Sequence, residues 1–421
     1  MWMKSLVRGV MSMNSVIRDG RFQKLIFANI LSSIGSGVTM IGVPWLLVNR
    51  EGGDQIYGYV TFCMTLLLFF LSPYLGVLID RLPRKKVLLF SEAFGFLIVI
   101  LFVGCGFFSG AYETWHLIGV YAGGSLYYTL HYPAQFAFNQ EIFTREQYRE
   151  LNSIMEIQNQ AASMLAGGLT SVLIERVDFS LILLVDAFTY VAGFLLLSFI
   201  PYVSSQSQIA VSKASIWSNM KEGFLYLKDK PLFTVFYISS LMPFIGIMVG
   251  NYLFPVYIAK TLGADGTIMG LADVMYAFGA ILGGYTIPFL LRRQGEFRTV
   301  FMTVSVFTAG TLLIAAIPIV GLFLILKITL GWGNAGSRVA RNTIMMNEVP
   351  NEVMGRVNSF FSAVGMLFRI SLLGLFARTA AYTGASFSLF IVGGLLIFAC
   401  AGVFISRSLF AKDVPTLSKS L

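Results

Sequence analysis

Cationic and amide side chains recur at helical spacing inside the apolar stretch 321–346. Lys327, Gly331, Asn334, Arg338 and Arg341 follow one another at intervals of four, three, four and three residues, so they share one face of a helix. A face with three cations and an amide turns away from lipid and can bind an anionic group. Lys327, Asn334 and Arg338 are therefore candidate substrate-binding residues. Lys327 and Arg341, near the two ends of the stretch, can also extend to the membrane surface.

A second polar face is predicted in the stretch 116–140. Tyr128, His131, Gln135 and Asn139 follow there at intervals of three, four and four residues. We expect Tyr128, His131 and Gln135 to contribute hydroxyl, imidazole and amide groups to substrate binding. An alternative interpretation of His131 is a hydrogen-bonded packing residue.

Arg369 lies near the centre of the stretch 354–377. From that depth its guanidinium cannot easily reach either membrane surface, so it must face a carboxylate or a wet cavity. We expect Arg369 to bind an anionic substrate, and a structural ion pair is the alternative role.

Acidic residues inside apolar stretches are candidates for carrying protons, because burial favours uptake of a proton by a carboxylate. Glu156 and Asp273 come first: Glu156 has polar neighbours on its helix face, and small apolar residues surround Asp273. Asp186 comes third, because its helix is expected to be peripheral and its carboxylate can serve packing alone. Glu92, near the start of its stretch, has no predicted role.

These side chains must be positioned by membrane-spanning helices. Of the 421 residues, 56% are hydrophobic and only 12% are charged, against roughly 25% charged residues in soluble domains. The predicted fold class is therefore an all-α polytopic membrane protein with 12 transmembrane helices. The expected spans are 25–49, 56–79, 87–109, 116–140, 151–175, 180–201, 231–259, 267–291, 298–318, 321–346, 354–377 and 385–406.

The basic residues predict how these helices are oriented. Most of the 30 lysines and arginines fall in segments assigned to the cytoplasmic side, whereas only Arg50, Arg176, Lys260 and Arg378 fall outside. This bias predicts that both termini are cytoplasmic, in the inner (cytoplasmic) cell membrane. The net charge of +9 is explained by orientation, so no nucleic acid partner is expected.

The hydrophilic stretch 202–230 divides the chain. Ile216, Met220, Phe224 and Leu227 fall on one helical face, which predicts an amphipathic helix on the inner membrane surface. The predicted domains are a cytoplasmic segment 1–24, a six-helix bundle 25–201, the linker 202–230, a second six-helix bundle 231–407 and a cytoplasmic tail 408–421.

The two halves echo each other. LSPYLGVLIDRLPRKKVLLF aligns at an offset of 208 residues with AILGGYTIPFLLRRQGEFRTVF, and Asn152-Ser153 aligns at an offset of 206 with Asn358-Ser359. Two parallel six-helix repeats are expected to hold a substrate site between the halves, near the bilayer midplane.

GVLIDRLPRKKVLL, from Gly76 to Leu89, resembles the loop signature between the second and third spans of the major facilitator superfamily. EGFLYLKDKPLF and NEVPNEVMGRVNSFFS are similar to its macrolide-efflux and enterobactin-exporter-like branch. The resemblance implies a secondary active exporter of amphipathic compounds, commonly proton-coupled, with two six-helix bundles.

Within the loop signature, Gly76, Asp80, Arg81 and Arg84 are expected to form a gating motif. Asp80 and Arg81, with Arg84 beyond them, can hold cytoplasmic helix ends together in one conformation and release them in another. The alternative interpretation is that the basic cluster only orients the chain.

Together these features predict a proton-coupled exporter of anionic or zwitterionic amphipathic molecules that works by alternating access. The expected partners are a small-molecule substrate and the lipid bilayer, the chain is expected to be monomeric, and no cofactor is expected apart from the proton gradient. Two alternatives remain: an uptake carrier for a polar anion, and a flippase for lipids or lipid headgroups. No phosphate-binding loop, metal cluster or nucleophile–histidine pair occurs in the sequence, so an enzyme is not expected.

Overall fold

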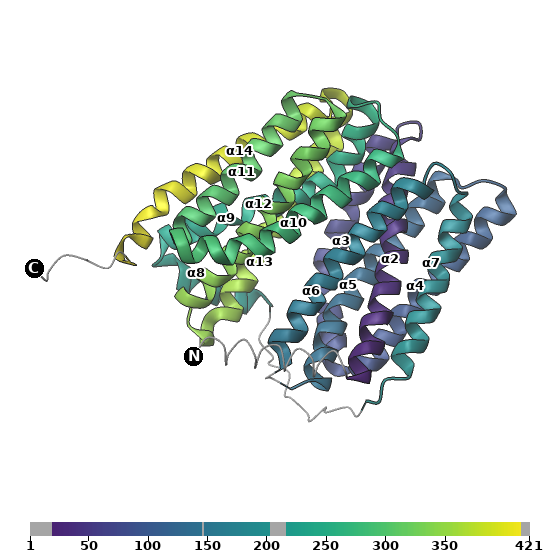
Figure 1. Cartoon of the computed structure of the whole chain (residues 1–421), viewed down its shortest axis with the longest axis horizontal. Helices are drawn as coiled ribbons and strands as arrows, with labels where there is room; N and C mark the ends of the chain where they lie inside the picture. Colours follow the sequence, from purple (N-terminus) through teal and green to yellow (C-terminus); the bar gives the residue numbers. More distant parts are fainter. Residues whose placement is uncertain (1–18, 145–146, 203–215, 414–421) are drawn as a thin grey trace, which may run out of the picture. The chain divides into compact units, whose positions relative to one another are not determined.

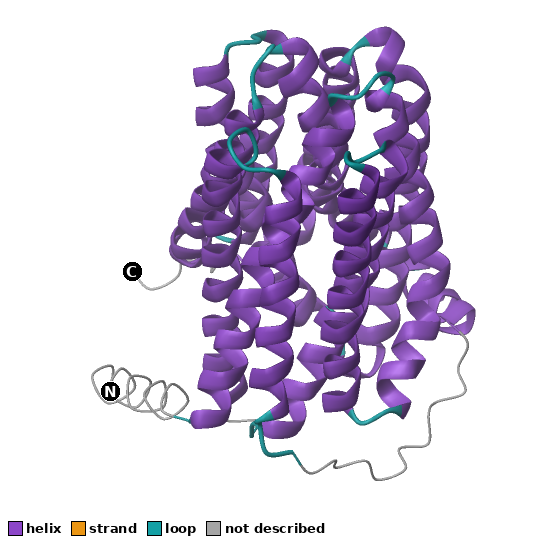
Figure 2. Ribbon diagram, turned by 90° about the vertical axis from the view of Figure 1, so that its right-hand side faces the viewer, coloured by secondary structure: helices purple, strands orange, loops and turns teal. Residues whose placement is uncertain are grey.

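The computed structural model describes residues 19–144, 147–202 and 216–413, and nearly all of them are helical (Figure 2). The long helices are α2 (Gly20–Val48), α3 (Gly53–Arg81), α4 (Arg84–Ser109), α5 (Thr114–Ile142), α6 (Tyr148–Leu173), α7 (Phe179–Ser198), α9 (Pro231–Val256), α10 (Gly266–Gln294), α11 (Glu296–Ala316), α12 (Val320–Glu348), α13 (Asn351–Thr383) and α14 (Ala385–Ile405). Three shorter elements are α8 (Ile216–Lys228), the π-helical turn η2 (Tyr257–Thr261) and the 3-10 helix η3 (Ser406–Asp413). Each predicted span corresponds to one long helix, and the all-α polytopic fold is confirmed.

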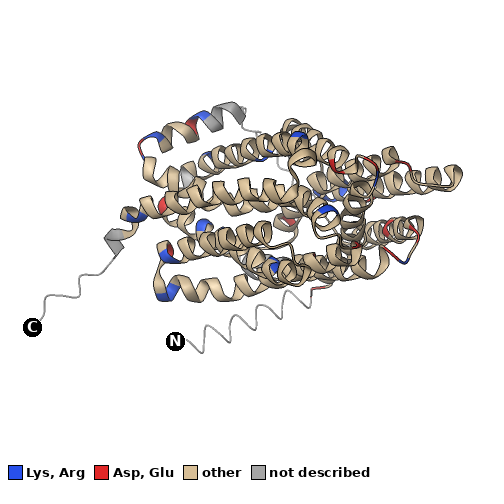
Figure 3. Cartoon of the chain, turned by 90° about the horizontal axis from the view of Figure 1, so that it is seen from above, with Lys and Arg blue, Asp and Glu red and all other residues tan. Residues whose placement is uncertain are grey.

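Ten of these helices are long and apolar enough to cross a membrane. Long stretches of the described helices carry no charged residue (Figure 3). The two long helices outside this set are α5 and α6. Both carry polar side chains along their length, among them Gln135 and Asn139 on α5 and Gln158 on α6, and these side chains lower their mean hydropathy.

Local signals fix several helix ends. Asp19 caps α2, because its carboxylate accepts the backbone N–H of Arg21 at 2.8 Å and pairs with the guanidinium at 2.7 Å. The hydrogen bond from the Arg21 side chain lowers the pKa of Asp19. Gly110 ends α4 with a positive φ of 70°, which a residue without a Cβ adopts at little cost. Pro231 starts α9, where its missing N–H costs no helical hydrogen bond.

The chain forms two compact units. Unit 1 comprises Met1–Ser212 together with Asp265–Val274, and unit 2 comprises Lys213–Ala264 together with Met275–Leu421. The first turns of α10 therefore group with unit 1, and the rest of that helix groups with unit 2.

Unit 1 is built around α2, which packs against α5, α6 and α7, while α4 packs between α5 and α7. Helices α2, α4 and α7 lie side by side in Figure 1. Glycines allow these helices to approach closely. A Cβ on Gly95 of α4 would meet the Tyr190 ring of α7 at 2.6 Å. A Cβ on Gly193 of α7 would meet Ser32 Oγ at 2.5 Å and Glu92 Oε2 at 2.9 Å. The side chains of Ser32 and Glu92 are thus packed directly against the backbone of α7 at Gly193.

We expect Gly193→Ala to lower the stability of unit 1 by about 1–3 kcal/mol, because the new methyl group overpacks a filled contact. The measurement is the thermal melting temperature of the purified protein in detergent. Gly104→Ala on α4 is the matched control, because a Cβ there has no other atom within 4 Å and gains the same helix propensity. Equal melting temperatures for the two variants would contradict the packing argument.

Unit 2 packs α11 against α12 and α14, and α14 against α9. The linker helix α8 packs on α13, where Glu222 pairs with Arg356 at 3.0 Å and the Phe224 and Phe360 rings lie 5.9 Å apart. Leu227 of the predicted apolar face is buried. The side chains of Ile216 and Met220, on the same face, are not among those described.

Candidate functional site

The first candidate group in unit 1 surrounds Asp186 of α7, which is 1% exposed. Thr39 Oγ1 of α2 donates to Asp186 Oδ2 at 2.6 Å, whereas the Thr189 hydroxyl donates to the backbone carbonyl of Asp186 at 2.7 Å. The second carboxyl oxygen, Oδ1, has no hydrogen-bond partner among the described residues. Asp186 therefore keeps one buried oxygen ready to accept a hydrogen bond or a proton.

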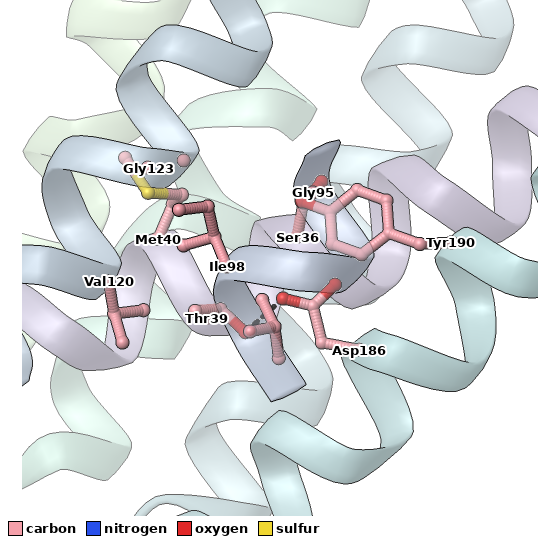
Figure 4. Close-up of a pocket in the computed structure, with 11 residues that line it drawn as sticks. Ser36, Thr39, Met40, Gly95, Ile98, Val120, Gly123, Asp186 and Tyr190 are labelled. Carbon is pink, nitrogen blue, oxygen red and sulfur yellow. Dashed lines mark hydrogen bonds between the residues drawn. The ribbon is translucent and has the colours of Figure 1, made fainter. Parts of the chain in front are cut away.

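A small cavity of about 10 Å³ lies beside this carboxyl group (Figure 4). Asp186, Ser36, Thr39 and Tyr190 supply its polar atoms, and α2, α4, α5 and α7 all contribute to its wall. The volume is about that needed for one water molecule.

A second buried carboxyl group belongs to Glu92 of α4, also 1% exposed. Ser32 of α2 donates to its Oε2 at 3.0 Å, and Tyr127 of α5 donates to its Oε1 at 3.2 Å. His131 Nδ1 lies 3.5 Å from the same Oε1. No lysine or arginine among the described residues lies within ion-pair distance of Glu92 or Asp186.

The predicted proton carriers differ in how far the structure describes them. Asp186 lies in the buried, cavity-lining position just described. Asp273 is half-buried on the part of α10 that groups with unit 1, near Gly167 of α6. Glu156 lies on α6, but its side chain is outside those described. Glu92 was visible in the sequence as a charge inside a span, yet its partners on α2 and α5 are distant in sequence.

The α5 face meets other helices of unit 1. Ser36 donates to the backbone carbonyl of Ser32 at 2.5 Å, so its oxygen accepts the hydroxyl of Tyr128 at 3.0 Å. His131 is 5% exposed and hydrogen-bonded, as the packing interpretation expects. Gln135 is also buried, and its Nε2 lacks a hydrogen-bond partner among the described residues. The predicted polar face is therefore largely enclosed within unit 1.

In unit 2, two predicted residues of α12 converge on one tyrosine. The Lys327 ammonium, 3% exposed, lies 4.2 Å from the centroid of the Phe254 ring and 5.3 Å from that of Tyr276. Asn334 Nδ2 donates to the Tyr276 hydroxyl at 2.6 Å. Aromatic faces stabilise a cation without neutralising it. The Lys327 ammonium is thus buried against two aromatic rings inside unit 2.

Lys327 and Arg341 do not extend to the membrane surface. Arg341 is 6% exposed, its Nη1 donates to the Ser240 carbonyl at 2.8 Å, and its guanidinium lies 5.6 Å from the Tyr237 ring centroid. The sequence left open that both side chains extend to the membrane surface, but aromatic rings and the Ser240 carbonyl hold them inside unit 2. Arg338 and Arg369, the other predicted cations, are half-buried.

The predicted gating motif spans the end of α3 and the start of α4. Arg84 Nη1 lies 3.3 Å from Glu141 Oε1 of α5, with both side chains mostly buried. The Tyr202 hydroxyl donates to the other oxygen of Glu141 and accepts the backbone N–H of Arg84 at 3.3 Å. Arg81 is exposed, and Gly76 has open space around it. The Asp80 side chain lies outside those described.

Beside this motif, Lys85 Nζ donates to the backbone carbonyls of Ser198 and Ile200, each at 2.7 Å, at the end of α7. A cation at a helix C-terminus also interacts favourably with the helix dipole. Arg84 and Lys85 thus tie α4 to α5 and α7. Sequence analysis missed Glu141 and Tyr202, because nothing in their local spacing links them to α4.

Glu141→Ala is expected to destabilise unit 1 by about 1–3 kcal/mol, because it removes the carboxylate that lies 3.3 Å from the mostly buried Arg84 guanidinium. The measurement is the melting temperature in detergent, with Glu51→Ala, at an exposed position between α2 and α3, as the control. If both variants melt like the parent, the Arg84–Glu141 contact contributes nothing to stability.

A third glutamate joins helix ends on the opposite side of unit 1. Glu175 Oε1 accepts the indole N–H of Trp45 at 2.9 Å and the backbone N–H of Gly266, at the start of α10, at 2.8 Å. A carboxylate at a helix N-terminus is favourable. This contact holds the first turn of α10 on unit 1.

The sequence profile of the Major Facilitator Superfamily matches residues 25–372. A Bacillus subtilis (strain 168) protein described as the uncharacterized MFS-type transporter YfiS is 21% identical over 392 residues, which cover 89% of this chain and 90% of that protein.

Solved structures with the same fold include the nucleoside transporter NupG, with a TM-score of 0.66 and 16% identity, covering 93% of this chain and 99% of that one. A bacterial homologue of the iron transporter ferroportin in its inward-facing state has a TM-score of 0.68 and 17% identity, covering 92% of this chain and 98% of that one. A bacterial homologue of the human lysosomal transporter Spinster has a TM-score of 0.63 and 14% identity, covering 95% and 100%. At this identity the likeness concerns the fold. Because the family profile covers most of the chain, this protein belongs to the major facilitator superfamily of membrane transporters, and it is not an enzyme.

Proposed function

We propose that this transporter exports an anionic or zwitterionic amphipathic small molecule in exchange for protons. The observation that carries the proposal is the opposite sign of the buried charges in the two units. Unit 1 buries the carboxyl groups of Glu92 and Asp186, whereas unit 2 buries the cations of Lys327 and Arg341. The buried carboxyl groups of unit 1 can bind protons, and the buried cations of unit 2 can attract an anionic group of the substrate.

The cations of α12 support an anionic group on the substrate. The Lys327 ammonium is buried and lies against the faces of Phe254 and Tyr276, which favour a cation at this place. Aromatic faces beside a cation suit a molecule that combines a negative group with an apolar body. Asn334, bound to the same tyrosine, adds a hydrogen-bonding group. Arg338 and Arg369 are proposed to supply further positive charge.

The Asp186 pocket supports a proton as the coupling ion. A proton needs one lone pair and a neighbouring water, and the pocket supplies an unpartnered carboxyl oxygen beside a cavity of one-water size. The side chains around Asp186 are hydroxyl groups. When the Asp186 carboxylate takes up a proton its buried negative charge is removed, and when it releases the proton the charge is restored. Glu156 and Asp273 remain alternative carriers.

Export is proposed from the resemblance of residues 222–233 and 347–362 to the macrolide-efflux and enterobactin-exporter-like branch. The distribution of lysine and arginine predicts that both termini lie in the cytoplasm. The alternative direction for the same α12 face is uptake of a polar anion.

The first measurement identifies which class of compound binds, and the second determines the direction of transport. Thermal shifts of purified protein with a catecholate siderophore, a macrolide, a nucleoside, ethidium and a fluorescent phospholipid identify the bound class. We expect anionic or zwitterionic compounds to raise the melting temperature and ethidium to leave it unchanged. Inside-out vesicles should then accumulate the bound compound when their lumen is acidic. A shift with ethidium alone would contradict the substrate class, accumulation only in right-side-out vesicles would indicate uptake, and translocation of the phospholipid alone would indicate a flippase.

A further inference from the structure

Glu92 and His131 form a buried acid–base pair between α4 and α5, and the proposed function assigns no proton-binding step to this pair. Their side chains are almost fully enclosed, and Glu92 Oε1 lies 3.5 Å from His131 Nδ1. The His131 ring stacks on the Tyr127 ring, with centroids 4.8 Å apart and an interplanar angle of 26°. The pair is therefore held in a fixed orientation.

The hydrogen bonds of the Ser91 hydroxyl group determine which ring nitrogen of His131 carries the hydrogen. Ser91 Oγ donates its only hydrogen to the Leu88 carbonyl at 2.7 Å. The same oxygen lies 3.0 Å from His131 Nδ1, so it can only accept there. His131 Nδ1 therefore carries a hydrogen, which also faces Glu92 Oε1. The second ring nitrogen, Nε2, is then the basic one.

The surroundings of Glu92 are matched to a negative charge. Ser32 donates to one oxygen and Tyr127 to the other, and the His131 Nδ1–H faces the same oxygen as Tyr127. Three donors and no ammonium or guanidinium among the described residues face this carboxylate. Without an added proton the pair carries one negative charge. With a proton on His131 Nε2, or on the carboxyl group, it is neutral.

The groups that face this pair from neighbouring helices are also known. From α7 come Asp186 and the Tyr190 ring, which contacts Tyr127 at 4.9 Å between centroids. From α5 comes the hydroxyl of Tyr127, and from α2 comes the hydroxyl of Ser32. Among the described residues, α3 contributes no charged contact to Glu92 or His131. Asp186 is the one other acid in this network, and its own oxygens bind Thr39 and face the cavity.

We propose that Glu92 and His131 together form a second proton-binding site, so that unit 1 takes up two protons in each transport cycle. The inference rests on the proposed proton coupling and assigns a site separate from Asp186. Asp186 and the Glu92–His131 pair each change their charge by one when a proton binds. With both sites protonated, unit 1 carries no negative charge at either place. His131 then acts on the proton and does not contact the substrate.

The test titrates the full-length protein in nanodiscs without any substrate, so its probe is the proton alone. The chain has two histidines, so ¹⁵N-histidine labelling gives two imidazole signals, and His116 is the internal reference. His116 lies on the same helix but caps its first turn, where Nδ1 accepts the backbone N–H of Glu113 at 2.9 Å. Infrared difference spectra over the same range, about pH 5 to pH 9, follow the carboxyl groups.

We expect the His131 signal and one carboxyl band to change over the same pH range, because coupled groups titrate as a pair. Glu92→Gln should remove that band and shift the midpoint of the His131 titration by about one pH unit or more, with His116 unchanged. His131→Gln should shift the carboxyl band in the same experiment. Tyr127→Phe removes one hydroxyl group without changing the ring, and it should shift both the His131 titration and the carboxyl band. This conservative variant tests the pair even if the other two variants fail to fold.

The inference is overturned if neither group titrates in this range, or if the His131 midpoint is the same with and without the Glu92 carboxyl group. Failure of the proposed function looks different. If the pair titrates as expected but a pH gradient drives no transport in vesicles, then proton coupling is wrong. If a gradient drives transport while the pair stays silent, then only the second proton site is wrong.

Discussion

Asp186→Asn is expected to abolish transport driven by a pH gradient while substrate binding and substrate exchange across the membrane persist. The asparagine keeps the size of the side chain and can still accept the Thr39 hydroxyl hydrogen, which Asp186 Oδ2 receives at 2.6 Å. It cannot take up and release a proton beside the cavity. The measurement is accumulation of the compound identified by the thermal-shift panel, with and without an imposed gradient, in proteoliposomes.

Two variants make this result specific. Asp229→Asn removes an exposed carboxylate after α8 and should transport like the parent. Thr39→Val keeps the carboxyl group but removes its hydroxyl donor, and should reduce gradient-driven transport without abolishing it. Full gradient-driven transport by Asp186→Asn would exclude Asp186 as the carrier and leave Glu156, Asp273 and the Glu92–His131 pair as the candidates to test.

Lys327→Met should weaken binding of an anionic substrate at least about 30-fold, because truncating one partner of a buried charge pair costs about 2 kcal/mol or more. Methionine fills a similar volume and keeps its contact with Phe254 and Tyr276. Binding of a neutral analogue of the same compound should change little. The measurement is the Kd of both compounds for parent and variant.

The control is Lys260→Met, which removes an exposed lysine in η2 and should leave both Kd values unchanged. If Lys327→Met weakens the anionic and neutral compounds equally, the ammonium serves packing and not recognition. If it weakens neither, the substrate group does not contact this part of α12.

Periodicity in the sequence predicts the helices and the polar faces well, because both depend on residues a few positions apart. The faces of α5 and α12 contain buried polar side chains, as the spacing of His131, Gln135, Asn334 and Lys327 indicates. The spacing of residues does not reveal which neighbouring helix packs against each polar face. The Glu92 site needs α2, α4 and α5 at one point, and its residues are up to about a hundred positions apart.

The same limit explains why the buried surroundings of Arg341 were not predicted. A cation near a span end can extend to the surface, and a single sequence does not show that Tyr237 and the Ser240 carbonyl of α9 lie within reach. Glu141 and Tyr202 were missed for a related reason, because their link to Arg84 joins three helix ends. Long-range pairings of this kind depend on packing, which one sequence leaves open.

The most direct test of proton-coupled export is a reversal of the imposed pH gradient in proteoliposomes of known orientation. The compound that binds best is loaded equally on both sides, and its movement is followed as the gradient is set, removed and inverted. We predict net movement against its own gradient, opposite to the proton flow, with a reversal of direction when the pH gradient is inverted. No net movement after the pH gradient is imposed, or net movement in the same direction for both signs of the pH gradient, would contradict the account.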